Sequence, residues 1–259
     1  MNGRNTPSNA RLGSRELRIM SAKTLSSTAL KRAWESKHQE QFPVRQPEQG
    51  VVDFVQFLPH QLPLNALDAG CGRGRNANYL SQQGFKVFGC DLSWLAIKIA
   101  KSRIPQQTKT IFYQVSDLTH LPYPDNCFGA AICVHVLPYH LKADLCASID
   151  ELWRVLRPGG WLYLDLLDCE DAEYGIGPEL EKNTFLDEGG VPIHFSFEQE
   201  ISGLMSKFRI QQQSRLKQGS SSRIRLVWEV WATKQETFTV AALPISAVKS
   251  DKVWDEKDF

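Results

Sequence analysis

Residues 66–76 read ALDAGCGRGRN, an apolar run interrupted by Asp68 and followed by three glycines at alternate positions. A glycine-rich turn between a strand and a helix brings backbone N–H groups and a helix N-terminus to an anionic ligand group, and glycine lets the ligand approach the main chain closely. Gly70, Gly72 and Gly74 form G-x-G-x-G, whereas the dinucleotide-binding fingerprint is G-x-G-x-x-G. The stretch predicts a strand, a ligand-binding turn and a helix, and leaves the ligand open.

On both sides of this stretch, short apolar runs alternate with amphipathic segments, which is the pattern of a parallel sheet with crossover helices. We expect strands at residues 64–69, 86–90, 111–115, 128–134 and 161–167, and helices at 29–41, 48–58, 76–83, 93–102 and around 145–156. Ser93 is expected to cap its helix, and Pro158-Gly159-Gly160 to end the last one. The fold class is α/β.

The C-terminal part of the chain has a different pattern. Ser196-x-x-Gln199 predicts a capping box that opens a helix to about residue 207. Residues 208–216 and 224–234 read as two strands with no helix between them, so they must pair as an antiparallel hairpin.

Two further carboxylates follow predicted strands. Asp91 ends the second strand, where a carboxylate can accept hydrogen bonds from both ribose hydroxyls of a nucleoside, and Asp117 follows the third. The ends of successive parallel strands meet at one crevice. Asp68, Asp91 and Asp117 therefore predict a nucleoside site, for which NAD and S-adenosylmethionine both qualify.

Composition narrows the class of protein. The 259 residues carry a formal charge of +1, so no global field attracts nucleic acid. No run of eighteen apolar residues is present, so we expect no membrane partner. The six cysteines include no C-x-x-C pair and suggest neither a metal site nor a disulfide framework, so a reducing, cytoplasmic location is expected.

Three regions are expected. Residues 1–28 read as a disordered basic extension, with a transit peptide as an open alternative. Residues 29–240 form the domain, with an N-terminal helical cap and an acidic insertion at 168–190 that either covers a site for a cationic substrate or is a solvated loop. Residues 241–259 read as a tail.

Several ordered motifs together resemble the class I S-adenosylmethionine-dependent methyltransferases. They are LDAGCGRGRNANYLSQQGFKVFGCDLS, VSDLTHLPYPDNCFGAAICVHVLPYH and ELWRVLRPGGWLYLDL. GRNANYL, EKNTF and GVPIHFSFEQEI are similar to the small-molecule branch that includes the tellurite-resistance and ubiquinone-biosynthesis methyltransferases. The resemblance implies a Rossmann-like seven-stranded sheet of order 3-2-1-4-5-7-6, with strand 7 antiparallel and helices on both faces.

The resemblance also implies S-adenosylmethionine as cofactor and S-adenosylhomocysteine as product, and it assigns roles. The backbone of Gly70, Cys71, Gly72 and Gly74 would surround the methionine part, with Asp68 supporting the turn. Asp91 would hold the ribose and Asp117 the adenine amino group. Leu92 and Leu118 would contact the adenine faces, Val134 would lie beside the cofactor, and Asn76 either touches the ligand carboxylate or only begins the helix.

Methyl transfer from a sulfonium needs orientation more than acid catalysis, and a base only when the acceptor carries a proton. HVLPYH, residues 135–140, offers His135 and His140 as proton acceptors and Tyr139 as a positioning group, with His135 the first choice. Trp34 is a candidate lid. The sequence contains no N-P-P-Y tetrad, no Pro-Cys nucleophile and no basic aromatic stripe, which favours a small-molecule acceptor.

Two other function classes remain open. A nicotinamide-dependent oxidoreductase would share the glycine turn and Asp91, but not the G-x-G-x-G spacing or Asp117. A non-catalytic protein that binds S-adenosylmethionine would keep every motif. Either a monomer or a homodimer is expected.

Overall fold

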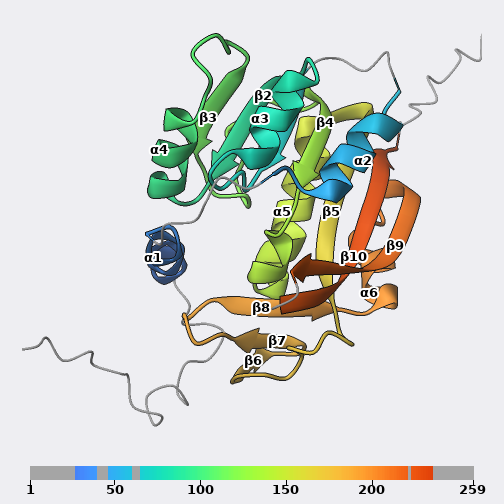
Figure 1. Ribbon diagram of the computed structural model, residues 1–259. Coiled ribbons are helices and arrows are strands. Elements are labelled where there is room, and N and C mark those ends of the chain that lie inside the picture. Colours follow the sequence, from blue (N-terminus) through green and yellow to red (C-terminus); the bar gives the residue numbers. More distant parts are fainter. Residues whose placement is uncertain (1–26, 40–45, 60–64, 221–222, 236–259) are drawn as a thin grey trace, which may run out of the picture.

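The computed structural model describes residues 27–39, 46–59, 65–220 and 223–235 (Figure 1). The predicted extension before residue 27 and the tail after residue 235 lie outside these residues. Five parallel strands form the centre of the sheet in the order β3-β2-β1-β4-β5. Their bounds are β1 Asn65–Ala69, β2 Lys86–Asp91, β3 Ile111–Val115, β4 Phe128–Cys133 and β5 Leu156–Asp168.

A C-terminal hairpin completes the sheet. β10 (Arg223–Lys234) pairs antiparallel with β5, and β9 (Phe208–Ser220) pairs antiparallel with β10. Counting these as strands 7 and 6 gives the order 3-2-1-4-5-7-6, so the predicted α/β fold and its antiparallel seventh strand are confirmed.

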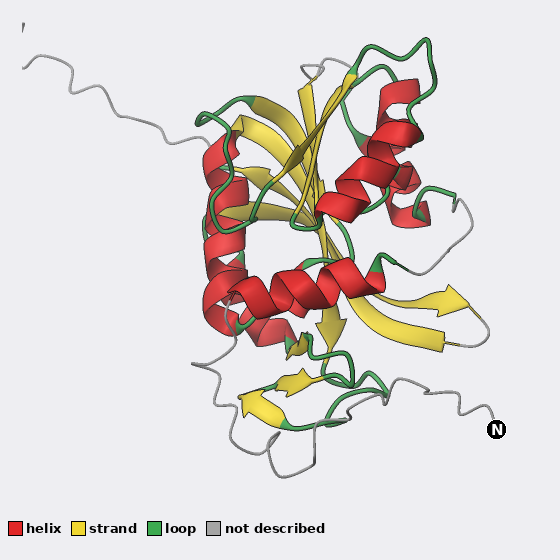
Figure 2. Cartoon of the chain, turned by 90° about the vertical axis from the view of Figure 1, so that its left-hand side faces the viewer, coloured by secondary structure: helices red, strands yellow, loops and turns green. Residues whose placement is uncertain are grey.

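Helices cover both faces of this sheet (Figure 2). On one face α5 (Lys142–Val155) and α6 (Glu198–Leu204) pack on a core that includes Leu67, Leu164 and Val230. On the other face α2 (Gln49–Phe57), α3 (Arg75–Gln82) and α4 (Trp94–Ser102) pack on a second core around Phe54 and Ile132. Because both faces are covered, β4 is buried at every residue, which explains its unbroken apolar sequence.

Two local predictions need correction. Pro158-Gly159-Gly160 does not separate helix from strand, because α5 ends at Val155 and β5 begins at Leu156, with a register shift against β4 at this point. The capping box is also wrong, because Ser196 ends a strand and α6 begins at Glu198 without a side-chain cap. The Ser93 cap is confirmed, since its side chain accepts a hydrogen bond from the Ala96 N–H.

The acidic insertion is folded. It begins beyond β5 and forms β6 (Glu179–Glu181) and β7 (Thr184–Leu186), which pair antiparallel, and β7 pairs with β8 (Pro192–Ser196). β8 runs parallel to the end of β5 and joins this small sheet to the main one. The solvated-loop alternative is therefore wrong for the part of the insertion that forms β6 and β7.

One helix lies apart from the layers. α1 (Ser27–Lys37) lies between α4 and the insertion, near the carboxyl ends of the parallel strands (Figure 1). None of the described helices combines the length and apolar character needed to cross a bilayer.

A candidate cofactor and acceptor site

The glycine turn follows β1 and is held against β2. The N–H groups of Gly70 and Cys71 both donate to the Cys90 carbonyl, at 2.8 and 2.9 Å. Gly70 has φ +75°, and a Cβ there would lie 2.2 Å from a methyl carbon of Val136. This position therefore requires glycine for two reasons, the left-handed backbone conformation and the closeness of the Val136 side chain.

Asp91 closes the turn from the neighbouring strand. Its Oδ2 accepts from the Gly72 N–H and its Oδ1 from the Ser93 N–H, both at 2.9 Å. Burial raises its pKa, against the effect of these two hydrogen bonds and of nearby His38. Each carboxylate oxygen retains capacity for a further donor.

Asp117 has a comparable arrangement after β3. Its Oδ1 accepts from both the N–H and the Oγ1 of Thr119, at 2.9 and 2.8 Å. Asp117 lines the large cavity, and its Oδ2 has no partner within the described part of the chain.

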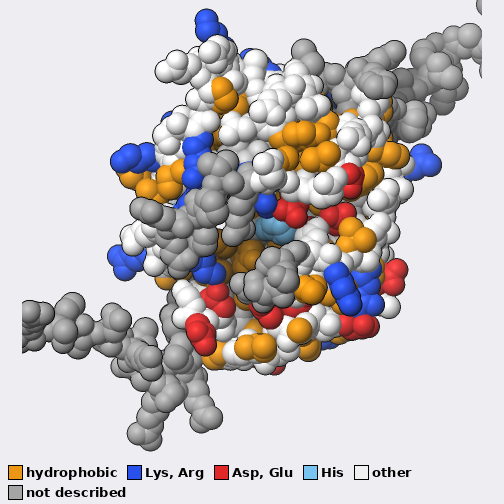
Figure 3. All heavy atoms as spheres, viewed as in Figure 1, with side chains coloured by type: hydrophobic (Ala, Val, Ile, Leu, Met, Phe, Trp, Pro, Cys, Tyr) orange, Lys and Arg blue, Asp and Glu red, His pale blue; other side chains and the backbone are white. Residues whose placement is uncertain are grey.

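A cavity of about 870 Å³, called the large cavity here, brings most of the predicted residues together. This volume is within the usual range of roughly 300–1,000 Å³ for sites that hold whole organic ligands. Histidine atoms are visible in a hollow on this face (Figure 3). The predicted site residues in its wall are Trp34, Gly70, Cys71, Gly72, Asn76, Asp91, Leu92, Asp117, Leu118, Val134, His135, Tyr139 and His140.

Two predicted residues lie behind this wall. Gly74, with φ +81°, is the N-cap of α3, and a Cβ there would meet the Tyr113 hydroxyl at 2.2 Å, so it serves the packing of α3 on the sheet. Asp68 is 2% exposed, and burial raises its pKa to about 7 despite the Arg75 charge. Its Oδ2 has no hydrogen-bond partner among the described residues.

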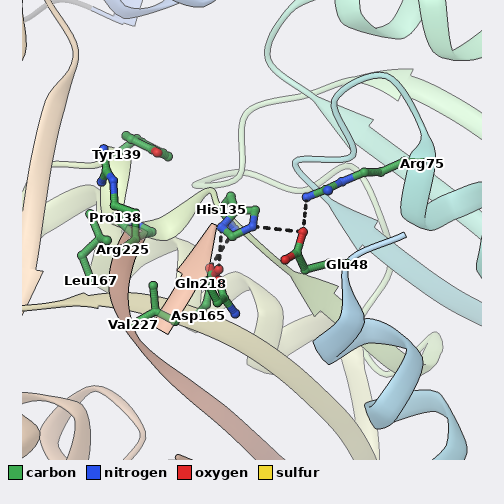
Figure 4. Close-up of a pocket in the computed structure, with 10 residues that line it drawn as sticks. All are labelled: Glu48, Arg75, His135, Pro138, Tyr139, Asp165, Leu167, Gln218, Arg225 and Val227. Atoms are coloured by element: carbon green, nitrogen blue, oxygen red, sulfur yellow. Dashed lines mark hydrogen bonds and ion pairs between the residues drawn. The ribbon is translucent and has the colours of Figure 1, made fainter. Parts of the chain in front are cut away.

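His135 lies at the end of β4 between two carboxylates (Figure 4). Its Nδ1 is 2.8 Å from Asp165 Oδ2 and its Nε2 is 3.4 Å from Glu48 Oε2, which also binds Arg75 at 2.7 Å. Burial opposes its charge, but the two carboxylates outweigh burial and raise the pKa of His135 to about 10. His135 is therefore an imidazolium at neutral pH and donates through both nitrogens.

The backbone of His135 is unusual as well. Its φ is +60°, a left-handed conformation that residues other than glycine rarely adopt. Asp165 stabilises it, because its Oδ1 accepts from the His135 N–H at 2.7 Å. One carboxylate thus holds both the backbone and the ring.

His140 has the opposite electrostatic character. Burial lowers its pKa below the usual value, so the ring is neutral at pH 7. Its Nδ1 lies 3.1 Å from the Val136 carbonyl and donates to it, which leaves the lone pair on Nε2. His140 is therefore the histidine of this pair that can accept a proton.

Tyr139 and Trp34 form an aromatic wall, with ring centroids 5.2 Å apart and planes at 80°. Around them α1 is fixed from two sides. Glu35 accepts from Ser93 Oγ and from the Trp94 and Leu95 N–H groups at the N-terminus of α4, and Lys37 pairs with Asp187 of the insertion at 2.8 Å.

A smaller cavity of about 160 Å³, called the side chamber here, adjoins the large cavity and shares Arg75, His135 and Tyr139 with it. Its other lining residues are Glu48, Pro138, Asp165, Leu167, Gln218, Arg225 and Val227 (Figure 4). Within the described ranges, no three His, Cys, Asp or Glu side chains are grouped as a metal site requires.

Sequence reasoning missed Glu48, Asp165, Gln218 and Arg225. Asp165 carried the only local signal, as a charged residue inside the buried strand segment YLDLL. The others come from α2 and the hairpin, and no local pattern links them to residues 135–140.

Comparison with known proteins agrees with this geometry. Residues 67–164 match the family described as "Methyltransferase domain". A tRNA N(3)-methylcytidine methyltransferase of Drosophila melanogaster is 27% identical over 162 residues, covering 58% of this chain and 50% of the relative. A malonyl-[acyl-carrier protein] O-methyltransferase of Pectobacterium atrosepticum is 36% identical over 104 residues, covering 40% of this chain and 39% of the relative. The chain thus spans half or less of the length of these relatives.

A solved structure extends the likeness in fold. The 1,6-didemethyltoxoflavin-N1-methyltransferase of Burkholderia thailandensis, with bound 1,6-didemethyltoxoflavin and S-adenosylhomocysteine, has a TM-score of 0.63 at 18% identity and covers 89% of this chain and 94% of its own. The family match, the glycine turn with Asp91, and the sheet order lead to one assignment. Residues 67–164 therefore match a methyltransferase domain, and the chain shares its fold with solved S-adenosylmethionine-dependent methyltransferases.

Proposed function

We propose that this protein transfers a methyl group from S-adenosylmethionine to a small-molecule acceptor. The observation that carries the proposal is the continuity of the site. The wall of the large cavity runs from the glycine turn and Asp91 to His135, Tyr139 and His140, where the side chamber adjoins it. A cofactor and an acceptor can therefore meet beside residues 135–140.

The residues present fit the cofactor. Gly70 and Gly72 keep the turn free of side chains, and at Gly72 a Cβ would meet only His38, at 4.0 Å. Asp91 has capacity to accept from ribose hydroxyls, and Asp117 Oδ2 from an adenine amino group. Leu92 and Leu118 line the same cavity and can contact the faces of the base. Asp68, behind the wall, would support the turn that faces the ligand.

When bound, S-adenosylmethionine supplies a methyl group on a sulfonium. The protein's own contribution is to bind, orient and exclude water. Holding the two reactants in line is worth up to about 7–11 kcal/mol of the barrier. No residue needs to protonate a leaving group, because the sulfur becomes neutral as the methyl is transferred.

The roles of the two histidines differ from the sequence-based preference. His135 donates to Asp165 and Glu48 and carries a proton at neutral pH, so it is a poor general base and is better described as a positioning residue. His140, neutral with its lone pair on Nε2, would accept a proton from acceptors that carry one. Tyr139 would orient the acceptor.

The general-base role of His140 predicts a specific loss. His140→Ala is expected to lower kcat about 10²–10⁴-fold for a protonated acceptor while leaving the affinity for S-adenosylhomocysteine unchanged. Below the lowered pKa of His140 the wild-type kcat should fall, and His140→Ala should lack this fall. Equal kcat values for the two proteins would contradict the role.

Support for a small acceptor comes from the size of the side chamber, about 160 Å³, and from the near-neutral charge of the chain. The named relatives act on different substrates, one on tRNA and one on an acyl-carrier protein. From the size of the chamber and the charge of the chain, we propose that neither nucleic acid nor membrane is a partner. We also propose that the protein acts in the cytoplasm and that it is a monomer or homodimer.

The deciding experiment is calorimetric titration with S-adenosylmethionine, S-adenosylhomocysteine and NADH, repeated on Asp91→Ala. Binding of both sulfur compounds, lost in Asp91→Ala and absent for NADH, is the expected result. Release of S-adenosylhomocysteine is then followed with a low-molecular-mass cell extract and with bulk tRNA. Turnover with tRNA alone would refute the small-molecule acceptor.

A further inference from the structure

Three carboxylates of the acidic insertion pair with basic residues of the hairpin. Arg215 binds Asp168 at 2.7 Å and Glu170 at 2.6 Å. Arg225 binds Glu173 at 2.5 Å through Nη2. The number of acids in this segment, on which the expectation of a cationic substrate was based, therefore overstates the negative charge that a substrate would meet.

Arg225 has a second nitrogen that this pairing leaves unused. Its side chain is 13% exposed, and Nη1 is buried without a hydrogen-bond partner among the described residues. A buried donor without a partner is unfavourable, and more so when the group is charged. Arg225 lines the side chamber, so an acceptor atom there could satisfy Nη1.

A second unsatisfied atom lies across the hairpin. Gln218 is the register partner of Arg225 on β9 and lines the same chamber. Its Nε2 donates to Glu229 at 2.7 Å, which fixes the orientation of the amide, and its Oε1 is buried without a partner among the described residues. Arg225 Nη1 is thus an unused donor of the chamber and Gln218 Oε1 an unused acceptor. Asp165 Oδ2 also lacks a hydrogen bond within the described ranges, although it is ion-paired with His135.

The charged groups of the chamber are ion-paired. The three cationic side chains of the lining, Arg75, His135 and Arg225, meet three carboxylates, Glu48 and Asp165 in the lining and Glu173 beside Arg225. Glu48 is bound by Arg75 and His135, Asp165 by His135, and Glu173 by Arg225, so the unused Nη1 of Arg225 is the cationic donor that remains for a ligand. Pro138, Leu167 and Val227 supply apolar contact for the body of a ligand.

We infer that the methyl acceptor carries a carboxylate, which binds Arg225 Nη1 in the side chamber, beside an N–H or O–H group that donates to Gln218 Oε1. A monoanionic carboxylate suits one unused guanidinium nitrogen better than a phosphate dianion does. The chamber is smaller than most whole-ligand sites, so it takes the carboxylate end while the reacting atom lies toward His140. This inference rests on the proposed methyltransferase function.

The test uses three probes of nearly the same shape: benzoate, benzamide and benzylammonium. Ligand-observed NMR titrations are run on the full chain with and without saturating S-adenosylhomocysteine. We expect benzoate to bind at least tenfold more tightly than benzamide, and benzylammonium not to bind. Equal or tighter binding of benzamide or benzylammonium would overturn the inference.

Arg225→Gln should reduce benzoate affinity at least tenfold. Arg209→Gln is the matched control, because Arg209 is an exposed arginine on the same hairpin, and it should leave the affinity unchanged. Unchanged benzoate binding in folded Arg225→Gln would overturn the inference. If that variant does not fold, the ranking of the three probes on the wild-type chain still decides.

The two proposals fail in different ways. Failure to bind S-adenosylhomocysteine would contradict the proposed function, whereas the benzoate ranking without cofactor tests the chamber alone. Cofactor binding with no preference for benzoate would leave the methyltransferase proposal intact and refute the carboxylate.

Discussion

At the scale of single residues, the site depends on backbone conformations that most side chains avoid. Gly70 and Gly72 in the turn and His135 beside it all have positive φ. Conformations of this kind concentrate at functional sites, where the surrounding structure holds them in place. Here Asp91 holds the turn and Asp165 holds His135.

Gly70→Ala is predicted to reduce both cofactor affinity and stability. The added Cβ would meet Val136 at 2.2 Å in addition to the left-handed strain of about 1–2 kcal/mol. Gly84→Ala is the matched control, because Gly84 has φ +92° but open space around its Cβ position. Calorimetry and urea unfolding should show the strain cost in both variants and loss of S-adenosylhomocysteine binding only in Gly70→Ala. A normal affinity in Gly70→Ala would contradict the close-approach role.

His135 predicts a pH dependence of stability. Its pKa is about 10 in the folded protein and about 6.5 in the unfolded chain, so the folded state binds the proton more tightly. Its contribution is therefore complete below pH 6.5 and is lost as pH rises through about 10.

Urea unfolding of wild type and His135→Gln at pH 6, 8 and 10 measures this contribution. The stability difference between the two proteins should be largest at pH 6 and shrink toward pH 10. If the difference in unfolding free energy between the two proteins stays constant or grows with pH, the charged His135 ring does not stabilise the fold.

At the scale of elements, α1 couples two parts of the site. Glu35 binds the N-terminus of α4 beside Asp91, while Lys37 binds the insertion at Asp187. A carboxylate at a helix N-terminus satisfies N–H groups and interacts favourably with the helix dipole. α1 is thus positioned as a wall of the large cavity, to which it contributes Leu30, Trp34 and Lys37.

Glu35→Ala is predicted to loosen α1 by about 1 kcal/mol. Trypsin should then cleave more rapidly within α1, at Lys31 or Arg32. S-adenosylhomocysteine should bind more weakly and should protect α1 less from this cleavage. Ser36→Ala, one residue further at an exposed position, is the control. Identical cleavage rates and affinities in the two variants would refute the lid role of α1.

At the scale of the whole molecule, the hairpin at the end of the described chain is part of the core. β10 pairs with β5 over seven residues and buries Val230 and Ala232. Lys234 then joins the end of β10 to the start of β5 and to the turn before β4, where Nζ donates to the Leu156 carbonyl and to Asn126 Oδ1, both at 2.7 Å. The same ammonium lies 4.0 Å from the Trp153 ring centroid.

Lys234→Met is therefore predicted to destabilise the protein by about 1–3 kcal/mol, because it leaves the buried Leu156 carbonyl without this donor. Lys207→Met is the control, because Lys207 also lies over Trp153 but pairs with exposed Asp150. It should change the free energy of unfolding by less than about 0.5 kcal/mol. Equal urea midpoints for the two variants would contradict the anchoring role of Lys234.

The sequence by itself determined the α/β layers and the antiparallel hairpin, and the family resemblance implied the order of the strands. It also predicted the residues of the cofactor end of the site. Strands, turns and helix caps are local, so ALDAGCGRGRN, the Ser93 cap and the helix-free hairpin could be read directly. Asp91 and Asp117 could be placed together because parallel strands in one sheet end at a common edge.

Only the tertiary structure decided what happens at the acceptor end. Glu48, Asp165, Gln218 and Arg225 come from four elements that meet around residues 135–140, and no local pattern predicts that meeting. His135 and His140 share one usual pKa, so the sequence offered no electrostatic ground for choosing between them as the base. Two carboxylates distant in sequence raise the first pKa, and burial lowers the second. Charge and hydrogen bonding act through space, so the protonation of these two histidines was set by the fold.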